Sequence, residues 1–509
     1  MSFIEREKME RVFLQELTTL MYPSDLLHAF GVNGKISGSI GAVGEMAGVL
    51  ALLHGPKGCA WHYRYSARRR HRPLYGIQSS DLTEEEIIRG GEAKLEAEVR
   101  KAYAAFRPSL ILIIPTPVSD ILNEDAQAVA RRLREREGIP VAAVGSELFS
   151  HRDKSYAQDR LKKLAQLKIT GDQKLELELR GCGFTEALYA LVEQVMEPCP
   201  PLPASVNIET VGWGEEGIRA LPEIEAFLNR AGITVNCRIP SCSVGELRLA
   251  PQASLNLVKR LRWARRMKER FGTEYLHIGN AGRYAGLEGI CTFYRDVAQA
   301  LGRGEAMEPL VIRARSRALE QTRDARELLS RHRCLLVCRG LQAAPKEVRR
   351  FAVDYGFTVG AVCVLVTPEM RKNLAITDEL MEQLIQRARE AIGLFCPGAS
   401  LLVNPGEEAL GEAVRDLQLI VGSDDVSLHR LGLPLLPACS DKLSLSFESY
   451  LRAVLRIARR VEDLKPLPDL LLGRLGFSSR WFPLLDSREN LAAKEMWSRM
   501  WLNRKEERS

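Results

Sequence analysis

Short apolar runs alternate with longer amphipathic stretches over the first 200 residues. Residues 49–53, 110–114 and 140–144 have the length and apolar composition of buried strands, whereas residues 84–105 and 124–137 repeat apolar positions at helical spacing. This alternation predicts a parallel, doubly wound sheet. Ligands of such sheets bind at the carboxyl ends of the strands.

The same alternation recurs twice further along the chain. A proline-rich segment at residues 198–203 marks the first boundary, because proline interrupts regular structure. The second region carries predicted strands at 206–211 and 234–239 and predicted helices at 218–231, 250–270 and 286–301. The third begins with a long charged helix over 306–332 and continues with predicted strands at 334–338, 358–366, 400–403 and 417–421.

These patterns predict an α/β fold with three Rossmann-like domains, each a parallel sheet flanked by helices. We expect the domains at residues 31–200, 201–305 and 306–463. A helical N-terminal arm at residues 1–30 and a C-terminal extension at 464–509 are expected to flank them.

Composition and charge narrow the class of protein. The chain has 509 residues, of which 46% are hydrophobic and 27% charged, as is usual for globular proteins. It lacks an apolar run of the length that spans a membrane, and its charged N-terminus is unlike a signal peptide, so we expect a cytoplasmic protein without membrane contact. The net charge of +7 comes from interspersed basic and acidic residues without a basic, aromatic-bearing face, so nucleic-acid binding is not expected.

The strongest candidate chemistry lies at residues 54–59, His-Gly-Pro-Lys-Gly-Cys, directly after the first predicted strand. A thiolate at the end of a strand, on a turn that glycines hold open, is a good ligand for iron. The remaining cysteines form no Cys-X-X-Cys pair, and those of the later strands are interpreted as small buried hydrophobic residues. Cys59 is therefore the candidate metal ligand.

Four segments in fixed order carry a family resemblance: residues 39–44, the HGPKGC turn, residues 77–95 and the strand at 109–115. This order resembles the nitrogenase component 1 superfamily, which includes the molybdenum-iron protein subunits, their cofactor-assembly scaffold and nitrogenase-like reductases. The resemblance implies an iron-sulfur cluster at Cys59, with Gly55 and Gly58 allowing the backbone to approach the sulfides closely.

The resemblance also implies two further cluster cysteines, and this chain lacks both. By register, Ser37 and Pro117 occupy their positions, and Cys182 lies near the same end of the first domain. One thiolate cannot hold a cluster. The resemblance therefore implies that a homologous alpha-type subunit supplies the other ligands, in an α2β2-like heterotetramer.

A second segment, from residue 242 to 272, resembles the part of alpha-type subunits in which a cysteine binds the active-site cofactor. Arg260 occupies that position, and a guanidinium has no lone pair for iron. Lys259 and Arg260 could instead pair with an anionic metallocofactor or tetrapyrrole, or they form a solvated pair. Leu445 stands near the family's cofactor histidine, so nitrogen reduction by this chain alone is not expected.

The sequence thus predicts one subunit of a heteromeric nitrogenase-like oxidoreductase, in which an interfacial cluster relays electrons from a separate ATP-hydrolysing 4Fe-4S iron protein. The chain has no Walker A loop, and its Gly-Trp-Gly-Glu-Glu-Gly segment is a plain turn, so no NAD is expected. Two alternatives remain open: a non-catalytic scaffold for cofactor assembly, and a cluster-free structural paralogue. The single cluster cysteine is beta-like and the 242–272 segment alpha-like, so the subunit type also stays open.

Overall fold

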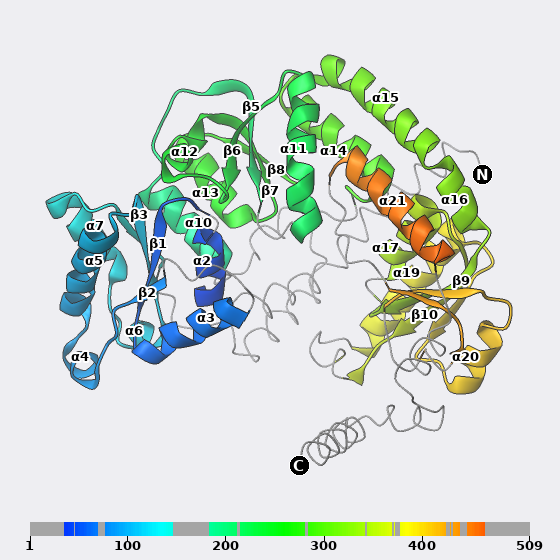
Figure 1. Cartoon of the computed structure of the whole chain (residues 1–509), viewed down its shortest axis with the longest axis horizontal. Coiled ribbons are helices and arrows are strands. Elements are labelled where there is room, and N and C mark those ends of the chain that lie inside the picture. Colours follow the sequence, from blue (N-terminus) through cyan, green and yellow to red (C-terminus); the bar gives the residue numbers. More distant parts are fainter. Residues whose placement is uncertain are drawn as a thin grey trace, which may run out of the picture. The chain divides into compact units, whose positions relative to one another are not determined.

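The computed structural model describes residues 35–463 apart from residues 45, 70–76, 146–182, 211–213, 280–282, 342–343, 369–370, 372–376, 424–427, 429–430 and 438–444 (Figure 1). The predicted arm at 1–30, Cys182 and the extension at 464–509 lie outside the described residues. The chain forms two compact units, the first running to Arg315 with the short stretch Ser444–Ser446, and the second comprising the remainder.

The first unit begins with a four-stranded parallel sheet of order β2-β1-β3-β4. Its strands are β1 (Val49–His54), β2 (Ile77–Ser79), β3 (Leu110–Pro115) and β4 (Val141–Ala143). Its helices are α2 (Lys35–Val43), α3 (Lys57–Arg69), α4 (Glu84–Arg89), α5 (Glu92–Phe106), α6 (Pro117–Ile121), α7 (Ala126–Glu137) and α10 (Gly183–Gln194).

The central strands β1 and β3 direct alternate side chains to two buried faces. Leu52 and Ile113 pack in one cluster with side chains of α5 and α7, while Leu53 and Ile114 pack in another with α2 and α10. Figure 1 shows α5 and α7 on one side of this sheet and α2 and α10 on the other. Because both faces are covered, the strands are almost continuously apolar, as buried parallel strands are. Candidate functional residues are therefore expected in the polar loops at the ends of the strands.

A second parallel sheet of order β6-β5-β7-β8 belongs to the same unit. Its strands are β5 (Leu202–Glu209), β6 (Thr234–Ile239), β7 (Ala253–Val258) and β8 (Glu274–His277). Its helices are α11 (Gly214–Arg230), α12 (Val244–Arg248), α13 (Leu261–Phe271) and α14 (Gly286–Ala300).

The prediction of one helix over residues 250–270 was wrong, because this stretch forms a short turn, the strand β7 and the helix α13. The strand was hidden by a buried polar residue. Asn256 lies in the middle of β7, and its side-chain oxygen accepts a hydrogen bond of 2.8 Å from Asn207 Nδ2 on β5. This polar pair thus interrupts the apolar runs of both central strands of the second sheet, β5 and β7.

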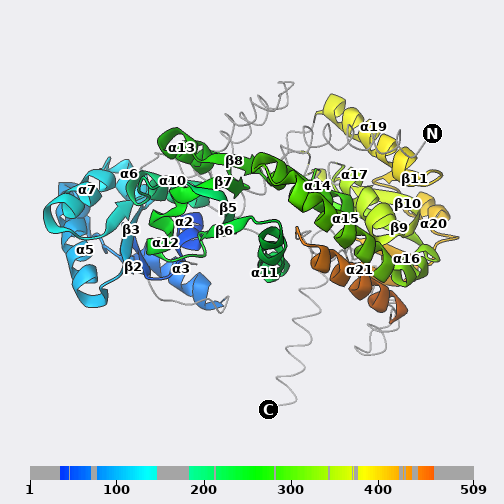
Figure 2. The ribbon, with the colours of Figure 1, turned by 90° about the horizontal axis from the view of Figure 1, so that it is seen from above.

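Charged contacts join α13 to α10, and buried apolar residues of both sheets form one core. Arg262 pairs with Glu186, and Arg270 Nη1 donates to the carbonyl of Val192 at 2.8 Å. Figure 2 shows α13 beside α10, and Trp263 of α13 is buried in the same cluster as Leu53 of β1. The first and second sheets, with the loops at the carboxyl ends of their strands, therefore belong to the same compact unit.

The second unit contains a five-stranded parallel sheet of order β11-β10-β9-β12-β13. Its strands are β9 (Arg333–Arg339), β10 (Thr358–Leu365), β11 (Ser400–Val403), β12 (Leu419–Gly422) and β13 (Leu435–Pro437). Flanking helices include α16 (Arg323–Ser330), α17 (Ala344–Arg349), α19 (Asp378–Phe395), α20 (Glu407–Ala413) and α21 (Phe447–Glu462).

Three parallel sheets flanked by helices confirm the predicted α/β fold class. The helix predicted over 306–332 is divided into α15 (Gly304–Gln321) and α16, and the helix predicted over 84–105 into α4 and α5. Among the residues that the structure describes, none of the helices is long and apolar enough to cross a membrane.

Candidate functional site

Cys59 lies at the carboxyl edge of the first sheet. Strand β1 ends at His54, the chain turns through Gly55 and Pro56, and α3 then begins. The amide of Cys59 donates to the carbonyl of Pro56 at 3.0 Å, which places the thiol in the first turn of α3. The residue is half-buried, and this burial raises the pKa of its thiol. At neutral pH the group therefore needs a metal or a positive charge to ionise.

The two glycines of this turn have different surroundings. A Cβ added to Gly55 would lie 2.1 Å from Thr116 Oγ1, so the first glycine is required by close packing against the loop after β3. A Cβ added to Gly58 would meet no heavy atom within 4 Å. Apart from its chain neighbours and its own helix, Gly58 is therefore open on the side where a side chain would point.

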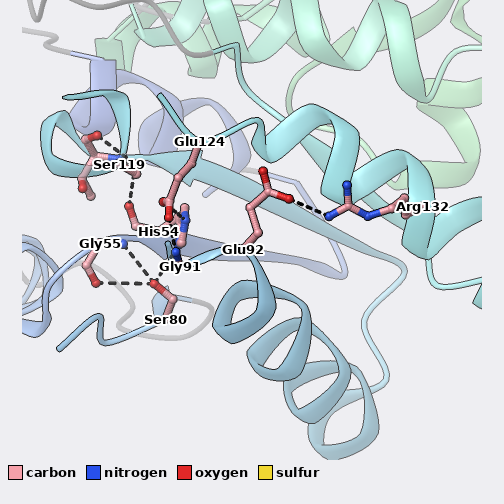
Figure 3. Close-up of polar contacts among 9 residues, drawn as sticks. His54, Gly55, Ser80, Gly91, Glu92, Ser119, Glu124 and Arg132 are labelled. Atoms are coloured by element: carbon pink, nitrogen blue, oxygen red, sulfur yellow. Dashed lines mark hydrogen bonds and ion pairs between the residues drawn. The ribbon is translucent and has the colours of Figure 1, made fainter. Parts of the chain in front are cut away.

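A chain of buried hydrogen bonds holds the Gly55 peptide of this turn (Figure 3). The amide of Gly55 donates to Ser80 Oγ at 3.0 Å, and Ser80 Oγ lies 3.0 Å from His54 Nδ1. His54 Nε2 in turn lies 2.6 Å from Glu124 Oε2, and the other carboxylate oxygen accepts from the amide of Gly91. The side chains of Ser80, His54 and Glu124 are all buried.

The partners of His54 indicate which ring nitrogen carries the proton when the ring is neutral. A carboxylate can only accept, so Nε2 carries the proton, and Nδ1 then accepts from the Ser80 hydroxyl, which also lies 3.5 Å from the Gly55 carbonyl. Burial lowers the pKa of His54, although Glu124 opposes this effect and Glu92 opposes it more weakly. Glu92 is itself paired with Arg132 at 2.8 Å. Burial thus favours the neutral imidazole, and both of its ring nitrogens have a buried partner.

Backbone groups of the same turn are anchored by the neighbouring loops. The carbonyl of His54 accepts from the amide of Thr116 and from Ser119 Oγ, each at 3.0 Å. The carbonyl of Gly55 accepts from the amide of Leu82 at 3.0 Å. Loops that follow β2 and β3 therefore hold the peptide from which α3 and Cys59 start.

The structure also places the positions at which the family resemblance implied further cysteines. Ser37 lies half-buried on α2, and Pro117 is the exposed first residue of α6. Within the described part of the chain, no group of three or more His, Cys, Asp or Glu side chains could hold a metal ion. The described residues of one chain therefore do not complete an iron-sulfur site.

The carboxyl edge of the second sheet is organised around Glu209, the fully buried last residue of β5. Its carboxylate accepts from the amides of Lys259 and Arg260 at 2.9 and 3.0 Å. It also accepts from Arg260 Nη1 at 2.6 Å and from Trp263 Nε1 at 3.1 Å. The Arg260 guanidinium lies 5.0 Å from the centre of the Phe184 ring of α10, a cation–π contact.

The structure thus brings Lys259 and Arg260 to the sheet edge where a second ligand was expected. Arg260 is not a solvated side chain, because Glu209 and Phe184 enclose it. Its pairing with an external anion remains a prediction, and in the chain itself Glu209 supplies the opposite charge. Leu445, at the position of the family's cofactor histidine, is buried, and its carbonyl accepts from Tyr294 Oη at 3.0 Å.

Sequence reasoning identified Cys59 but missed His54, Ser80 and Glu124. One signal was present: His54 opens the HGPKGC turn, and a histidine that ends an apolar strand needs a buried polar partner. The partner's identity was not visible, because Glu124 lies 70 positions further along the chain.

The chain is similar to known proteins both in sequence and in fold. The family model described as "Nitrogenase component 1 type Oxidoreductase" matches residues 35–167 and 181–394, which is more than half of the chain. The nitrogenase iron-molybdenum cofactor biosynthesis protein NifE of Clostridium pasteurianum is 25% identical over 50% of this chain and 51% of its own length. A subunit of the light-independent protochlorophyllide reductase of Heliobacterium modesticaldum is 28% identical over 48% of this chain and 44% of its own length.

The chain thus spans about half the length of these two relatives. NifE of Rhizobium meliloti is 24% identical over 83% of this chain and 82% of its own length. A solved structure described as "Nitrogenase Cp1 at pH 5" covers 84% of this chain and 88% of its own, with a TM-score of 0.51 and 15% identity, which shows the shared fold. On the family match, the chain belongs to the nitrogenase component 1 type oxidoreductases.

Proposed function

We propose that this chain is one subunit of a nitrogenase-like oxidoreductase complex, and that Cys59 contributes one sulfur ligand to an iron-sulfur cluster completed by a partner subunit. The observation that carries the proposal is the turn itself. A half-buried thiol stands at the carboxyl edge of a parallel sheet, beside a glycine whose Cβ position is open, on a peptide anchored from two neighbouring loops. Such an edge is where ligands of this fold class bind.

The surroundings of the thiol favour a protein partner over open solvent. Trp61, two residues after Cys59, is 62% exposed, and Ile121 at the end of α6 is 74% exposed. Trp61 lies on α3 and Ile121 on α6, and both helices begin at the carboxyl edge of the first sheet. Large apolar side chains at such a position are typical of a protein–protein contact. We propose a homologous alpha-type subunit as the partner, in an α2β2-like arrangement.

A cluster shared in this way would store and pass single electrons. We propose that a separate ATP-hydrolysing iron protein supplies them, and that the substrate or cofactor site lies in the complex. The mixed similarity to cofactor-biosynthesis proteins, a protochlorophyllide reductase and a nitrogenase chain leaves the substrate class to experiment.

The second sheet bears on one alternative, a scaffold for assembly of a nitrogenase-type metallocofactor. At the position where alpha-type subunits are expected to hold their cofactor, this chain has Arg260 locked to Glu209. A guanidinium can pair with an anionic precursor and release it, whereas a thiolate would bind the iron covalently. NifE proteins of three of the matched organisms are described as cofactor-biosynthesis proteins, in agreement with this alternative.

The test is metal content of the native complex. The chain is purified with an affinity tag from its own host without oxygen, together with any other chain that co-elutes in fixed proportion, and iron, sulfide and electron paramagnetic resonance (EPR) are measured. We expect iron and sulfide in the wild-type complex and their loss in Cys59→Ala. Cys199→Ala is the matched control, because Cys199 is also only half-buried but lies outside the turn.

An iron-free wild-type complex would contradict the proposal, as would a Cys59→Ala complex that keeps its full iron and its EPR signal. Turnover then separates the two roles. An oxidoreductase subunit supports substrate reduction when an iron protein and MgATP are supplied. A scaffold instead transfers bound metal to an apo acceptor protein without turnover.

A further inference from the structure

We infer that Glu124, His54 and Ser80 are positioning residues that fix the location of the Cys59 sulfur through the turn that precedes it. The inference rests on the proposed function, because it assigns a role to groups behind the proposed cluster ligand. The hydrogen bonds of the three side chains lead to one another, to the Gly55 peptide and to the Gly91 amide at the sheet edge. They therefore act on the thiol through the backbone.

The hydrogen bonds run in one direction from the turn to the carboxylate. The Gly55 amide donates to the Ser80 hydroxyl. With the neutral ring protonated at Nε2, this hydroxyl donates to His54 Nδ1, and His54 Nε2 donates to Glu124. Glu124 also accepts from the Gly91 amide at the start of α5. Each buried group thus uses its donor and acceptor capacity in a single consistent pattern. A change at Glu124 therefore reaches the Gly55 peptide through two intervening side chains.

The anchors come from several parts of the sheet edge. His54 ends β1, Ser80 follows β2, Gly91 precedes α5, and Glu124 lies between α6 and α7. The lengths of the three links, 3.0, 3.0 and 2.6 Å, leave little freedom for the turn to move away from the edge. Since α3 begins two residues after Gly55, this restraint fixes the direction in which the Cys59 side chain leaves the helix.

The carboxylate supplies the two acceptor oxygens that this geometry uses, one for the His54 N–H and one for the Gly91 amide. It also has an electrostatic consequence. The carboxylate adds a buried negative charge behind the turn, and the neighbouring Glu92 is neutralised by Arg132. A fixed negative charge disfavours further negative charge nearby in a low-dielectric interior. We therefore expect Glu124 to lower the reduction potential of a cluster at Cys59.

The test uses the native complex with its partner subunit and two substitutions of different severity. Glu124→Gln keeps the size of the side chain, removes the charge and replaces one acceptor oxygen by an NH2 donor. Ser80→Ala removes one hydroxyl and breaks the chain of hydrogen bonds between Gly55 and His54. Asp354→Asn is the matched control, because Asp354 is also a buried carboxylate, paired with Arg349 at 3.1 Å in the other compact unit.

Three quantities are measured: the rate at which the Fe(II) chelator bathophenanthroline removes iron, the midpoint potential by EPR-monitored titration, and the melting temperature. Loss of a residue that orients a metal ligand typically weakens metal binding about 10–100-fold, so we expect iron release to accelerate to that extent in both variants. The midpoint potential should rise in Glu124→Gln. The Asp354→Asn complex should match the wild type in release rate and potential.

The outcomes separate the inference from the proposed function. A wild-type complex without iron would refute the proposed function itself. A wild-type complex with iron, together with unchanged release rates and potentials in Glu124→Gln and Ser80→Ala, would refute only the positioning role. The same holds if both variants lower the melting temperature but release iron at the wild-type rate. If Glu124→Gln does not fold, Ser80→Ala decides the question by its release rate.

Discussion

Replacing Gly55 with alanine would put a methyl group into space that Thr116 already occupies. The added Cβ would lie 2.1 Å from Thr116 Oγ1 and 2.7 Å from its Cγ2. Thr116 is fully buried and β-branched, so its side chain has little freedom to move aside. Overpacking of this kind costs about 1–3 kcal/mol, while a Gly-to-Ala change at an unstrained site gains about 0.4–1 kcal/mol. We expect Gly55→Ala to lose about 1–2 kcal/mol.

Gly58→Ala is the matched substitution in the same turn. Its Cβ meets nothing within 4 Å, and the residue lies in the first turn of α3, where alanine is the better helix former. The isolated chain should therefore keep its stability or gain about 0.4–1 kcal/mol. In the complex the expectation reverses. If cluster sulfides approach the backbone here, the Gly58→Ala complex should retain less iron than the wild type.

Hydrogen–deuterium exchange of peptides that span β1 and β3, together with calorimetry of the isolated chain, measures the stability effect locally. The double substitution Gly55→Ala with Thr116→Ala should recover part of the loss, because the two closest atoms are then removed. The packing argument is wrong if Gly55→Ala exchanges at the wild-type rate, or if Gly58→Ala destabilises the isolated chain as much as Gly55→Ala does.

Three further substitutions test other parts of the structure. Trp61→Ala should weaken association with the partner subunit, with a loss of about 2 kcal/mol in sedimentation or interferometry, whereas Phe106→Ala, 58% exposed at the opposite edge of the sheet, should not. Glu209→Ala should cost about 3 kcal/mol in denaturant unfolding, because it leaves the Arg260 charge without its partner. Because burial lowers the pKa of His54, the unfolded chain binds this proton more readily than the folded one, so the free energy of unfolding should fall as the pH drops through 6.5. His54→Gln should remove that pH-dependent component, as measured by unfolding between about pH 5.5 and 8.

The fold could be predicted where apolar runs and helical periodicity act locally. Strands β1, β3, β9 and β10 carry mostly apolar side chains because both of their faces are buried, and each was predicted close to its observed bounds. The failure at β7 has the opposite cause. Asn256 is tolerated in the core because Asn207 of the adjacent strand and the Met267 sulfur satisfy its side chain, and nothing local to the sequence reveals the Asn207 partner.

The division of the helix over 84–105 has a similar explanation. Gly90 has a φ of 99°, which ends α4, and the amide of Gly91 then donates to Glu124. The glycine pair was visible in the sequence, but its acceptor is 33 residues away. The candidate site follows the same rule: the position of Cys59 could be predicted from its own turn, whereas Ser80 and Glu124 become part of the site only when three strand ends meet.

The two sheet edges of the first unit differ in a way that bears on which of them could hold a redox group. At the first edge the thiol of Cys59 has an open glycine beside it. At the second, Arg260 is already paired with a fully buried carboxylate, which also accepts two backbone amides and an indole N–H. An anionic ligand that drew Arg260 away would leave Glu209 buried without its counter-charge, at a cost of about 3–5 kcal/mol.

That cost sets a limit on binding at the second edge. A ligand with an intrinsic micromolar affinity, about 8 kcal/mol, would be weakened by about 10²–10⁴-fold if it had to break the pair. A ligand that binds alongside the intact pair would meet a net charge near zero and gain little from Arg260. Neutralising Glu209 by Glu209→Gln should therefore strengthen binding of an anionic cofactor precursor in equilibrium dialysis. Weaker binding in Glu209→Gln than in the wild type would show that Glu209 holds Arg260 in its binding orientation, and would favour the scaffold role.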